Sequence, residues 1–316
     1  MRREISVAVA TVALAIVLAF AAPSYFSTQN LRDLFLVNMP VLVAAVGTTL
    51  VILAGEIDIS VGSAFAVCAV VAGLVAKAGM PAAAAGLVAC ALGATLGALN
   101  GALIAYARIP SIVVTLATMV ALRDALRWAT QGAWVENLPA RFQWLGATQS
   151  AFPIATGCGV AALVLAIGWA MRNVAAGRAV YATGSNAEAA RLAGIDTARV
   201  KLGVFTIAGA LTGLAALLNS VRFNQIPSNT GLGLEMKVIA SVVVGGAAIT
   251  GGRGTFTGTV LGVTLLGAIG PALTFLRVSA QWERAAQGAI ILAAVTIDAV
   301  RAHRAARGAS RAESGV

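Results

Sequence analysis

Long apolar runs dominate this sequence, interrupted only by turns, prolines and isolated charges. Ten of these runs approach the roughly 20 residues that a helix needs to cross a bilayer. They would use about 200 residues and leave ~116 for loops and tails. Only 11% of the residues are charged, whereas a soluble domain has about 25%. We therefore expect an all-α, polytopic membrane protein. The composition excludes a water-soluble enzyme, a disordered regulator and a fibrous protein.

The charge distribution predicts how the spans are oriented. An even number of spans places both termini on one side, and Arg2 and Arg3 favour the cytoplasm. Thirteen of the 22 Lys and Arg residues then lie inside. The first run could instead be a signal peptide, but no secreted domain follows it, and we expect an uncleaved helix. The ten predicted spans are 5–22, 36–54, 61–77, 82–107, 111–128, 151–171, 200–221, 235–251, 255–275 and 284–300.

The formal net charge of +10 does not indicate a nucleic-acid partner, because the basic residues lie between apolar runs and form no basic domain. We interpret them as markers of the cytoplasmic side, and membrane lipid as the surrounding partner. Cys68, Cys90 and Cys158 fall in three different runs, which favours buried thiols over a disulfide. The single histidine, His303, lies in a basic tail, so we expect no histidine metal site.

One polar loop, residues 172–199, is unusually long for a chain that exposes so little to water. Ser185 and Glu188 have the spacing of a capping box, and Gly194 suits the left-handed position after a helix. We expect a helix of about eight residues between them, roughly 12 Å long and too short to span. Its alanines leave room for a close partner. The loop is either a helical linker or a rigid knob presented to a cytoplasmic protein.

A second polar segment, residues 129–150, lies on the opposite side and is rich in aromatic residues, among them Trp134, Phe142 and Trp144. Aromatic side chains at the membrane interface explain this composition. Docking of an external partner is the alternative.

Several motifs resemble the ribose-type permease subunits of ATP-binding-cassette (ABC) importers. After the second span comes Gly55-x-Ile57-Asp58-Ile59-Ser60-Val61-Gly62-Ser63. Between the fourth and fifth spans lie Asn100-Gly101, Ile109-Pro110-Ser111 and Thr115-Leu116. The long loop carries Gly177-Arg178, Tyr181-Ala182, Gly184, Asn186, Glu188-Ala189-Ala190-Arg191 and Gly194-Ile195. The late motifs are Gly231-x-Gly233-x-Glu235, Val244-Gly245-Gly246 and Gly251-Gly252-Arg253-Gly254-Thr255. The matches follow one order along residues 36–300.

The resemblance implies one transmembrane permease domain over residues 1–316 in a bacterial inner membrane, with a coupling loop at 172–199 and a disordered basic tail at 302–316. It also implies a second permease subunit, identical or different, a periplasmic sugar-binding protein and cytoplasmic ATPase subunits that hold ATP and magnesium. The chain itself has no phosphate-binding loop of the G-x-x-x-x-G-K-[ST] type. We therefore expect no enzymatic activity and no cofactor in this chain.

By the same resemblance, ATPase coupling is expected to rest on the long loop. The candidate residues are Arg178, Tyr181, Gly184, Ser185, Asn186, Glu188, Ala189, Ala190, Arg191 and Gly194. A Glu188→Lys change is expected to abolish uptake and ATPase association and to leave membrane insertion intact.

Polar side chains within or beside the spans are candidates for the substrate path, because sugar hydroxyls need donors and acceptors. They are Glu56, Asp58, Asn100, Thr115, Arg123, Asp124, Asn219 and Asn224. Three have simpler explanations: Asp58, or Ser60, could cap the third helix, and Arg123 and Asp124 could form a local ion pair. Glu56 stands where the resembling proteins usually have glycine. Glu235 is explained by a carboxylate at a helix N-terminus.

Two glycine triplets at four-residue spacing predict close helix packing. They are Gly93, Gly97, Gly101 and Gly254, Gly258, Gly262. A glycine-lined sugar path is the alternative for these positions.

These observations favour a permease for a monosaccharide of the ribose, rhamnose or autoinducer-2 kind. A nucleoside or branched-chain amino acid permease is the closest alternative. An ion-coupled secondary carrier would need intramembrane acid or histidine relays, which are sparse here. An intramembrane enzyme would need a clustered catalytic constellation, and the sequence offers none.

Overall fold

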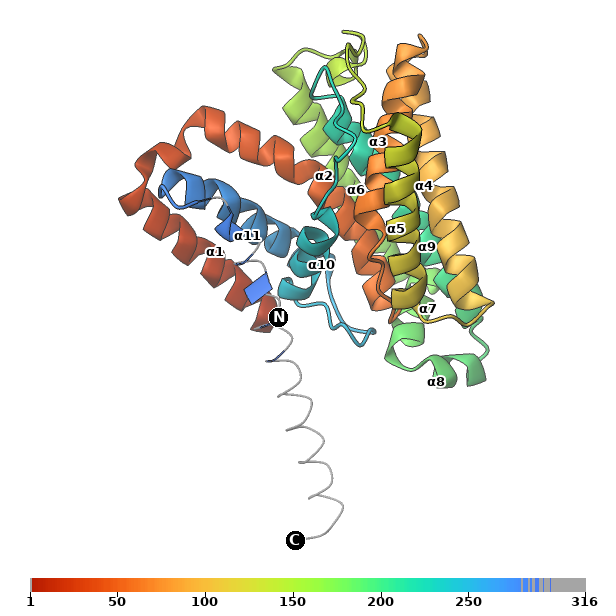
Figure 1. The fold of residues 1–316 in the computed structure, drawn as a ribbon. Helices are drawn as coiled ribbons and strands as arrows, with labels where there is room; N and C mark the ends of the chain where they lie inside the picture. The colour runs from red at the N-terminus through yellow and green to blue at the C-terminus, as the bar shows by residue number, and fades with distance from the viewer. Residues whose placement is uncertain are drawn as a thin grey trace.

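A computed structural model describes residues 2–279, 281–283, 285, 288, 289, 292 and 296. Within this part the chain is helical and contains no strand, which agrees with the all-α prediction. The helices are α1 (Arg2–Ala21), η1 (Pro23–Phe26), α2 (Thr28–Leu53), α3 (Val61–Lys77), α4 (Ala82–Ala105), α5 (Ser111–Thr130), η2 (Gln143–Gly146), α6 (Ala151–Asn173), α7 (Ala175–Ser185), α8 (Ala187–Leu192), α9 (Thr197–Ser220), α10 (Leu234–Val244) and α11 (Phe256–Phe275). Figure 1 shows their arrangement.

Among the described helices, six are long and apolar enough to cross a membrane: α1, α2, α4, α6, α9 and α11. Helix α3 is apolar but has 17 residues. Helix α5 has 20 residues and includes Arg123, Asp124 and Arg127. The prediction of a full span at 235–251 is wrong in its extent: α10 ends at Val244, where Gly245 and Gly246 begin a turn. The predicted tail and nearly all of the predicted span 284–300 lie outside the described residues.

Helix α2 forms the centre of the core, and every residue from Pro40 to Leu53 is buried. Helices α6, α9, α10 and α11 pack against it, and α3 and α4 pack in turn on α9. The closest pair is α4 with α9, where glycines let the two backbones touch. A Cβ on Gly97 would overlap the carbonyl of Phe205, and a Cβ on Gly209 would overlap the carbonyl of Gly93. The predicted packing role of the first glycine triplet is therefore confirmed. Gly258 and Gly262 play the same part between α11 and α10.

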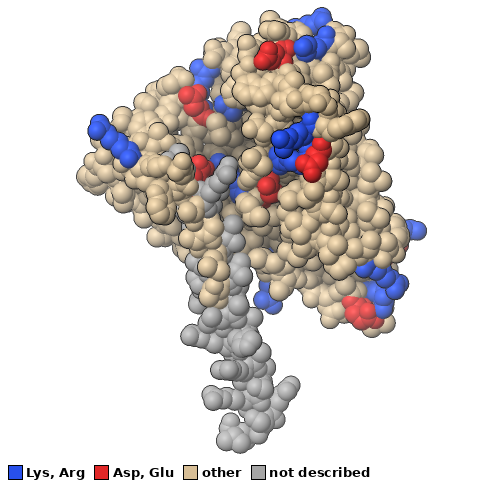
Figure 2. All heavy atoms as spheres, viewed as in Figure 1, with Lys and Arg blue, Asp and Glu red and all other residues tan. Residues whose placement is uncertain are grey.

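Helices α1 and α11 form a lobe beside this core, joined through η1 (Figure 1). Tyr25 of η1 is buried there and its ring meets Phe275 edge-on. Large apolar side chains point outward from several helices, such as Phe20, Leu87 and Leu165, which are 73–85% exposed. Most of the surface in Figure 2 carries no charge. Such a surface suits lipid rather than water.

Residues 131–150, which we call the cap, fold over one end of the core. Val135 and Ile226 exchange two backbone hydrogen bonds, and the N–H of Trp144 donates to the carbonyl of Val221. Phe142 is fully buried, whereas Trp134 is about half exposed. The cap is thus an ordered lid on α3, α4 and α9. Helices α7 and α8 lie at the opposite end of the molecule, the α8 end (Figure 1).

Candidate functional site

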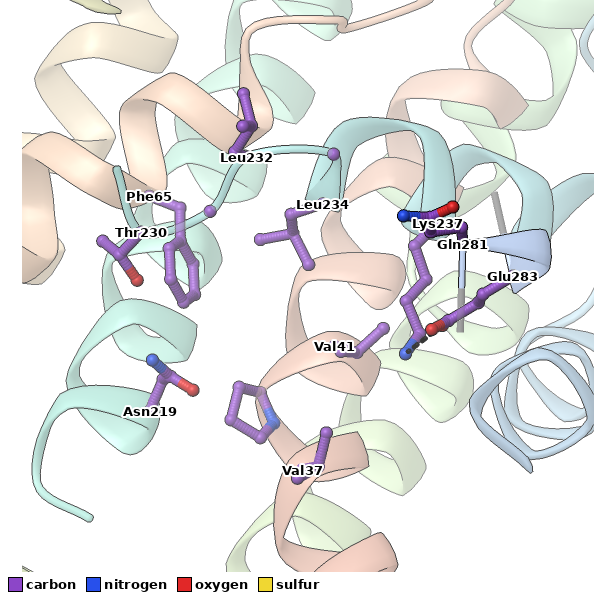
Figure 3. Close-up of a pocket in the computed structure, with 13 residues that line it drawn as sticks. Val37, Val41, Phe65, Asn219, Thr230, Leu232, Leu234, Lys237, Gln281 and Glu283 are labelled. Atoms are coloured by element: carbon purple, nitrogen blue, oxygen red, sulfur yellow. Dashed lines mark ion pairs between the residues drawn. The ribbon is translucent and has the colours of Figure 1, made fainter. Parts of the chain in front are cut away.

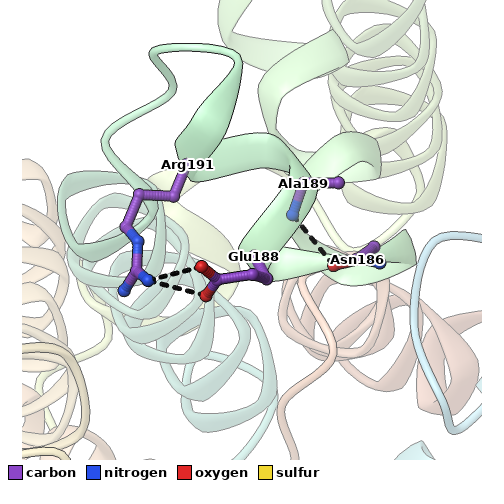
Figure 4. A network of polar contacts seen from close by, with 4 residues as sticks. All are labelled: Asn186, Glu188, Ala189 and Arg191. Atoms are coloured by element: carbon purple, nitrogen blue, oxygen red, sulfur yellow. Dashed lines mark hydrogen bonds and ion pairs between the residues drawn. The ribbon is translucent and has the colours of Figure 1, made fainter.

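The long polar loop contains two helices, α7 and α8, rather than the single helix of about eight residues that was predicted. The predicted capping box is also wrong. Ser185 is the last residue of α7, and the side chain of Asn186 caps α8 by accepting from the N–H of Ala189 at 3.0 Å. An amide oxygen caps a helix as well as a hydroxyl does. The Glu188 carboxylate does not bond to the backbone of the N-terminal capping residue of α8. It accepts two hydrogen bonds from Arg191 instead, both at 2.7 Å (Figure 4).

The predicted helix stop at Gly194 is confirmed. Gly194 has a φ of +83°, its N–H donates to Arg191, and the N–H of Ile195 donates to Ala190. This is the paired hydrogen-bond pattern that ends a helix at a left-handed glycine. Asp196 then caps α9 by accepting from the N–H of Arg199. Helix α8 is therefore fixed at both ends, and the chain passes directly into α9.

The outer side of α8 is exposed and carries both charged and apolar side chains. Glu188 and Arg191 pair on it with 63% of each side chain exposed. Leu192 beside them is 81% exposed, more than any other described leucine. Ala190 is the buried residue of this helix and turns toward the core. The sequence reasoning missed Leu192, although an apolar residue among charges at the end of a short helix was the available signal.

Helix α7 faces inward and contacts two other segments. The backbone of Gly184 touches the carbonyl of Leu53 and the N–H of Gly252, so closely that no Cβ would fit. The Tyr181 hydroxyl donates to the carbonyl of Gly254 at 3.1 Å. Burial raises the pKa of Tyr181 above its ordinary value, so the hydroxyl keeps its proton. Of the predicted coupling residues, Tyr181 and Gly184 on α7 and Ala190 on α8 thus make internal contacts, while Glu188, Ala189 and Arg191 on α8 face outward.

Segment 54–60 joins α2 to α3 without helical structure, and polar groups satisfy its backbone. Asp58 is buried and accepts from the N–H and the hydroxyl of Ser60 at 2.8 and 2.6 Å. Asn100 of α4 donates to the Ser60 hydroxyl at 3.0 Å and accepts from Thr118 of α5 at 2.7 Å. We call Asp58, Ser60, Asn100 and Thr118 the polar network. Asp58 does accept from a backbone N–H at the start of α3, whereas Ser60 makes no capping bond.

Three predicted pathway residues therefore lie together. Asp58 and Asn100 belong to the polar network, and Thr115 donates to the carbonyl of Ile57 in the same segment at 3.4 Å. Buried polar groups cost free energy unless they are paired, and here they pair across three segments of the chain.

Asn100→Ala is expected to lower the free energy of unfolding by about 2 kcal/mol, because it removes the acceptor of the Thr118 hydroxyl and one of the two hydrogen bonds of the Ser60 hydroxyl. Thermal unfolding in detergent measures this. Thr95→Ala is the control, since Thr95 is exposed and bonds only to its own helix. Equal melting temperatures for the two variants would contradict the stabilising role of the network.

Glu56 lies away from the other pathway candidates. Its carboxylate pairs with Lys201 of α9 at 2.5 Å, at the α8 end of the molecule. The two residues line a cavity of about 320 Å³ with Arg108, Glu188, Arg191 and other residues around the start of α9. The expected substrate-path role of Glu56 has no support in this position.

The remaining candidates lie toward the cap. Asn219 lines a larger cavity, about 730 Å³, together with Phe65 and Thr230 on one wall and the Lys237–Glu283 ion pair on the other (Figure 3). Arg123 donates to the carbonyl of Thr230 at 3.5 Å, so it reaches the loop beside this cavity.

Asp124 and Asn224 are exposed and do not line that cavity. Among the described ion pairs, none joins Arg123 to Asp124, so the expected local pair is not formed. The backbone carbonyl of Asn224 instead accepts from Leu138 and holds the cap.

Glu235 has the predicted place at the first turn of α10, where its carboxylate accepts from the N–H of Gly233 at 3.3 Å. Its second oxygen is buried against Gly62 at the start of α3, and no hydrogen-bond partner is found for it among the described residues. Gly62 and Glu235, from two separate motifs, are thus in contact, and a side chain at position 62 would overlap the Glu235 carboxylate.

Comparison with known proteins identifies the family. A family described as "Branched-chain amino acid transport system / permease component" matches residues 30–295. The chain belongs to this permease family. It is therefore a multi-pass inner-membrane transport subunit of an ABC importer and not an enzyme. No solved structure matches the chain.

Several similar curated proteins are permeases of one named system. The autoinducer 2 import system permease protein LsrC of Yersinia pseudotuberculosis serotype O:1b is 37% identical over 297 residues, 94% of this chain and 84% of that protein. The LsrC protein of Escherichia coli strain K12/DH10B is 36% identical over 296 residues, 94% of this chain and 86% of that protein. The LsrC protein of Salmonella choleraesuis strain SC-B67 is 37% identical over 294 residues, 92% and 85% respectively.

Proposed function

We propose that this permease carries a small, polyhydroxylated, sugar-like molecule from a periplasmic binding protein at the cap end to the cytoplasm at the α8 end. The observation that carries the proposal is the identity of 36–37%, over 94% of the chain, to permeases named for autoinducer 2 import. The cavity beside Asn219, Thr230 and Lys237 supports it, because hydroxyl groups need such donors and acceptors.

The topology in this proposal is ten spans with both termini in the cytoplasm. The distribution of Lys and Arg supports it, because 13 of the 22 fall in the segments that the sequence assigns to the cytoplasm. The α8 end would then face the ATPase subunits, which hold ATP and magnesium. Helix α8 suits this contact because it is exposed, fixed at both ends and carries Leu192 at its end.

A second permease subunit belongs to the proposal as well. Asp124 and Arg127 are exposed on α5, a helix whose other exposed side chains include Leu116 and Val120. Charged groups on a lipid-facing helix are costly, and they usually face a protein partner or a water-filled path. We place the second permease subunit, identical or different, against this face of α5.

Deleting the gene in its own host is expected to abolish import of labelled autoinducer 2, and the wild-type gene on a plasmid is expected to restore it. Ribose and leucine are measured in parallel. Leucine is included because the family description names branched-chain amino acids. Loss of leucine import with unchanged autoinducer 2 import would replace the sugar-like substrate by an amino acid. Unchanged import of all three probes would contradict the proposed substrate class.

A further inference from the structure

The Glu56–Lys201 ion pair is more enclosed than the other ion pairs near α8. Its atoms lie 2.5 Å apart, with 12% of the Glu56 and 24% of the Lys201 side chain exposed. The neighbouring pairs, Glu188 with Arg191 and Asp196 with Arg199, are 51–82% exposed. Solvent screens an exposed pair strongly, so that its interaction is weak, whereas a partly buried pair is screened less.

Lys201 is the residue of the pair that lies close to α8 along the chain. It lies in the first turns of α9, five residues after Asp196, whose side chain caps that helix. Only Ala193, Gly194, Ile195 and Asp196 separate α8 from α9. Because the hydrogen bonds at Gly194 fix this turn, a displacement of α8 carries the start of α9 with it.

Glu56 is the residue of the pair that is next in the chain to buried polar groups of the core. It lies in the non-helical segment 54–60, where the next residues are Ile57, whose N–H donates to the Ser111 hydroxyl, and Asp58 of the polar network. Just before it, the carbonyl of Leu53 accepts from the N–H of Gly252. Segment 54–60 thus lies between the α8 end and buried groups of α3, α4 and α5.

The cavity between these parts allows relative movement. Its volume is about 320 Å³, and its lining includes Glu56 and Lys201 as well as Ala187, Glu188 and Arg191 of α8. In an interior packed without voids, close contacts between side chains would hold α8 in place. Here an ion pair between Glu56 and Lys201 lies at the edge of an open cavity.

We infer that Glu56 and Lys201 are positioning residues that form a coupling pair: they tie segment 54–60 to the start of α9, so that movement of α8 reaches the polar network. The inference rests on the proposed function, in which ATPase subunits displace α8. It gives Glu56 a role at the α8 end in place of the substrate path, and it gives Lys201 a role that its sequence context did not indicate.

A charge-swap experiment tests the pair. The complete transporter is purified through a tag on this chain, with Glu56→Gln, Lys201→Gln, or the double exchange Glu56→Lys with Lys201→Glu. Arg199→Gln is the control, because it breaks an exposed pair at the start of α9 and leaves the Asp196 cap in place. Three quantities are measured: the amount of co-purified ATPase subunit, uptake of labelled autoinducer 2 into proteoliposomes, and ATP hydrolysed per molecule taken up.

Each single change is expected to keep wild-type ATPase association and to lower uptake per ATP about tenfold, while the double exchange recovers most of it, as for a direct pairwise interaction. The control is expected to match wild type. The inference is overturned if the single variants transport normally, if they lose the ATPase subunit, or if the double exchange is no better than either of them. A wild-type transporter without uptake would instead refute the proposed function, so the two failures are distinct.

Discussion

Gly97→Leu is expected to prevent the permease from folding into a stable membrane protein. Any Cβ at this position would overlap the carbonyl of Phe205, so α4 and α9 could not approach each other. Overpacking of this kind usually costs about 1–3 kcal/mol even where a side chain can yield, and here the obstacle is backbone. We expect little or no monodisperse protein after detergent extraction, measured by size-exclusion chromatography.

Gly203→Leu on α9 is the matched control, since a Cβ there meets nothing within 4 Å. It is expected to give wild-type yield. The smaller change Gly97→Ala is expected to leave some folded protein with a clearly lowered Tm, whereas Gly203→Ala should raise or preserve Tm because alanine favours helix by up to about 1 kcal/mol. Equal behaviour of the two positions would contradict the close packing of α4 on α9.

Leu192→Asp is expected to abolish association with the ATPase subunit while the permease still inserts and folds. Leu192 is 81% exposed in this chain alone. Burying a leucine in a partner contributes about 1.5–3 kcal/mol, or roughly a 10–150-fold change in affinity. An aspartate there would also lose its hydration in the contact. The measurement is the ratio of ATPase subunit to permease after purification through a tag on the permease.

Glu188→Lys should act in the same direction, because it removes the pair with Arg191 and places two cations together on the face of α8. The controls make the same changes at the opposite end of the molecule: Leu145→Asp and Glu136→Lys in the cap, where both residues are exposed. ATPase ratios that fall equally in α8 and cap variants would show a general loss of structure, and unchanged ratios in the α8 variants would refute docking on α8.

The helices were predictable because the membrane simplifies the sequence pattern. Apolar runs ended by charge, glycine or proline gave 61–77 for α3, identical to its bounds, and 255–275 for α11, which begins at Phe256. The start of α2 was missed by eight residues, since its first turns carry Arg32 and Asp33 and extend beyond the apolar run. Helix α10 was predicted too long because hydropathy continues past Gly245, where the backbone turns.

The site was predictable where local chemistry decides and unpredictable where packing decides. Gly194 ends α8 as expected, because a left-handed turn favours a residue without Cβ. The N-terminal capping residue of α8 was predicted to be Ser185 and is Asn186. Both side chains can cap a helix, and only the end of α7 at Ser185 distinguishes them. The partner of Glu56 is 145 residues away in the sequence, and no local pattern relates it to Lys201.

Photocrosslinking from position 192 tests the central claim, that α8 is where ATP-driven movement enters this permease. A photoreactive phenylalanine analogue is placed at position 192, and at position 145 in the cap as the control, in membranes that contain the complete transporter. Illumination is expected to join the permease to the ATPase subunit from position 192 and not from position 145, with the adduct identified by mass spectrometry. An assembled transporter that gives no ATPase adduct from position 192, or equal adducts from both positions, would contradict the account.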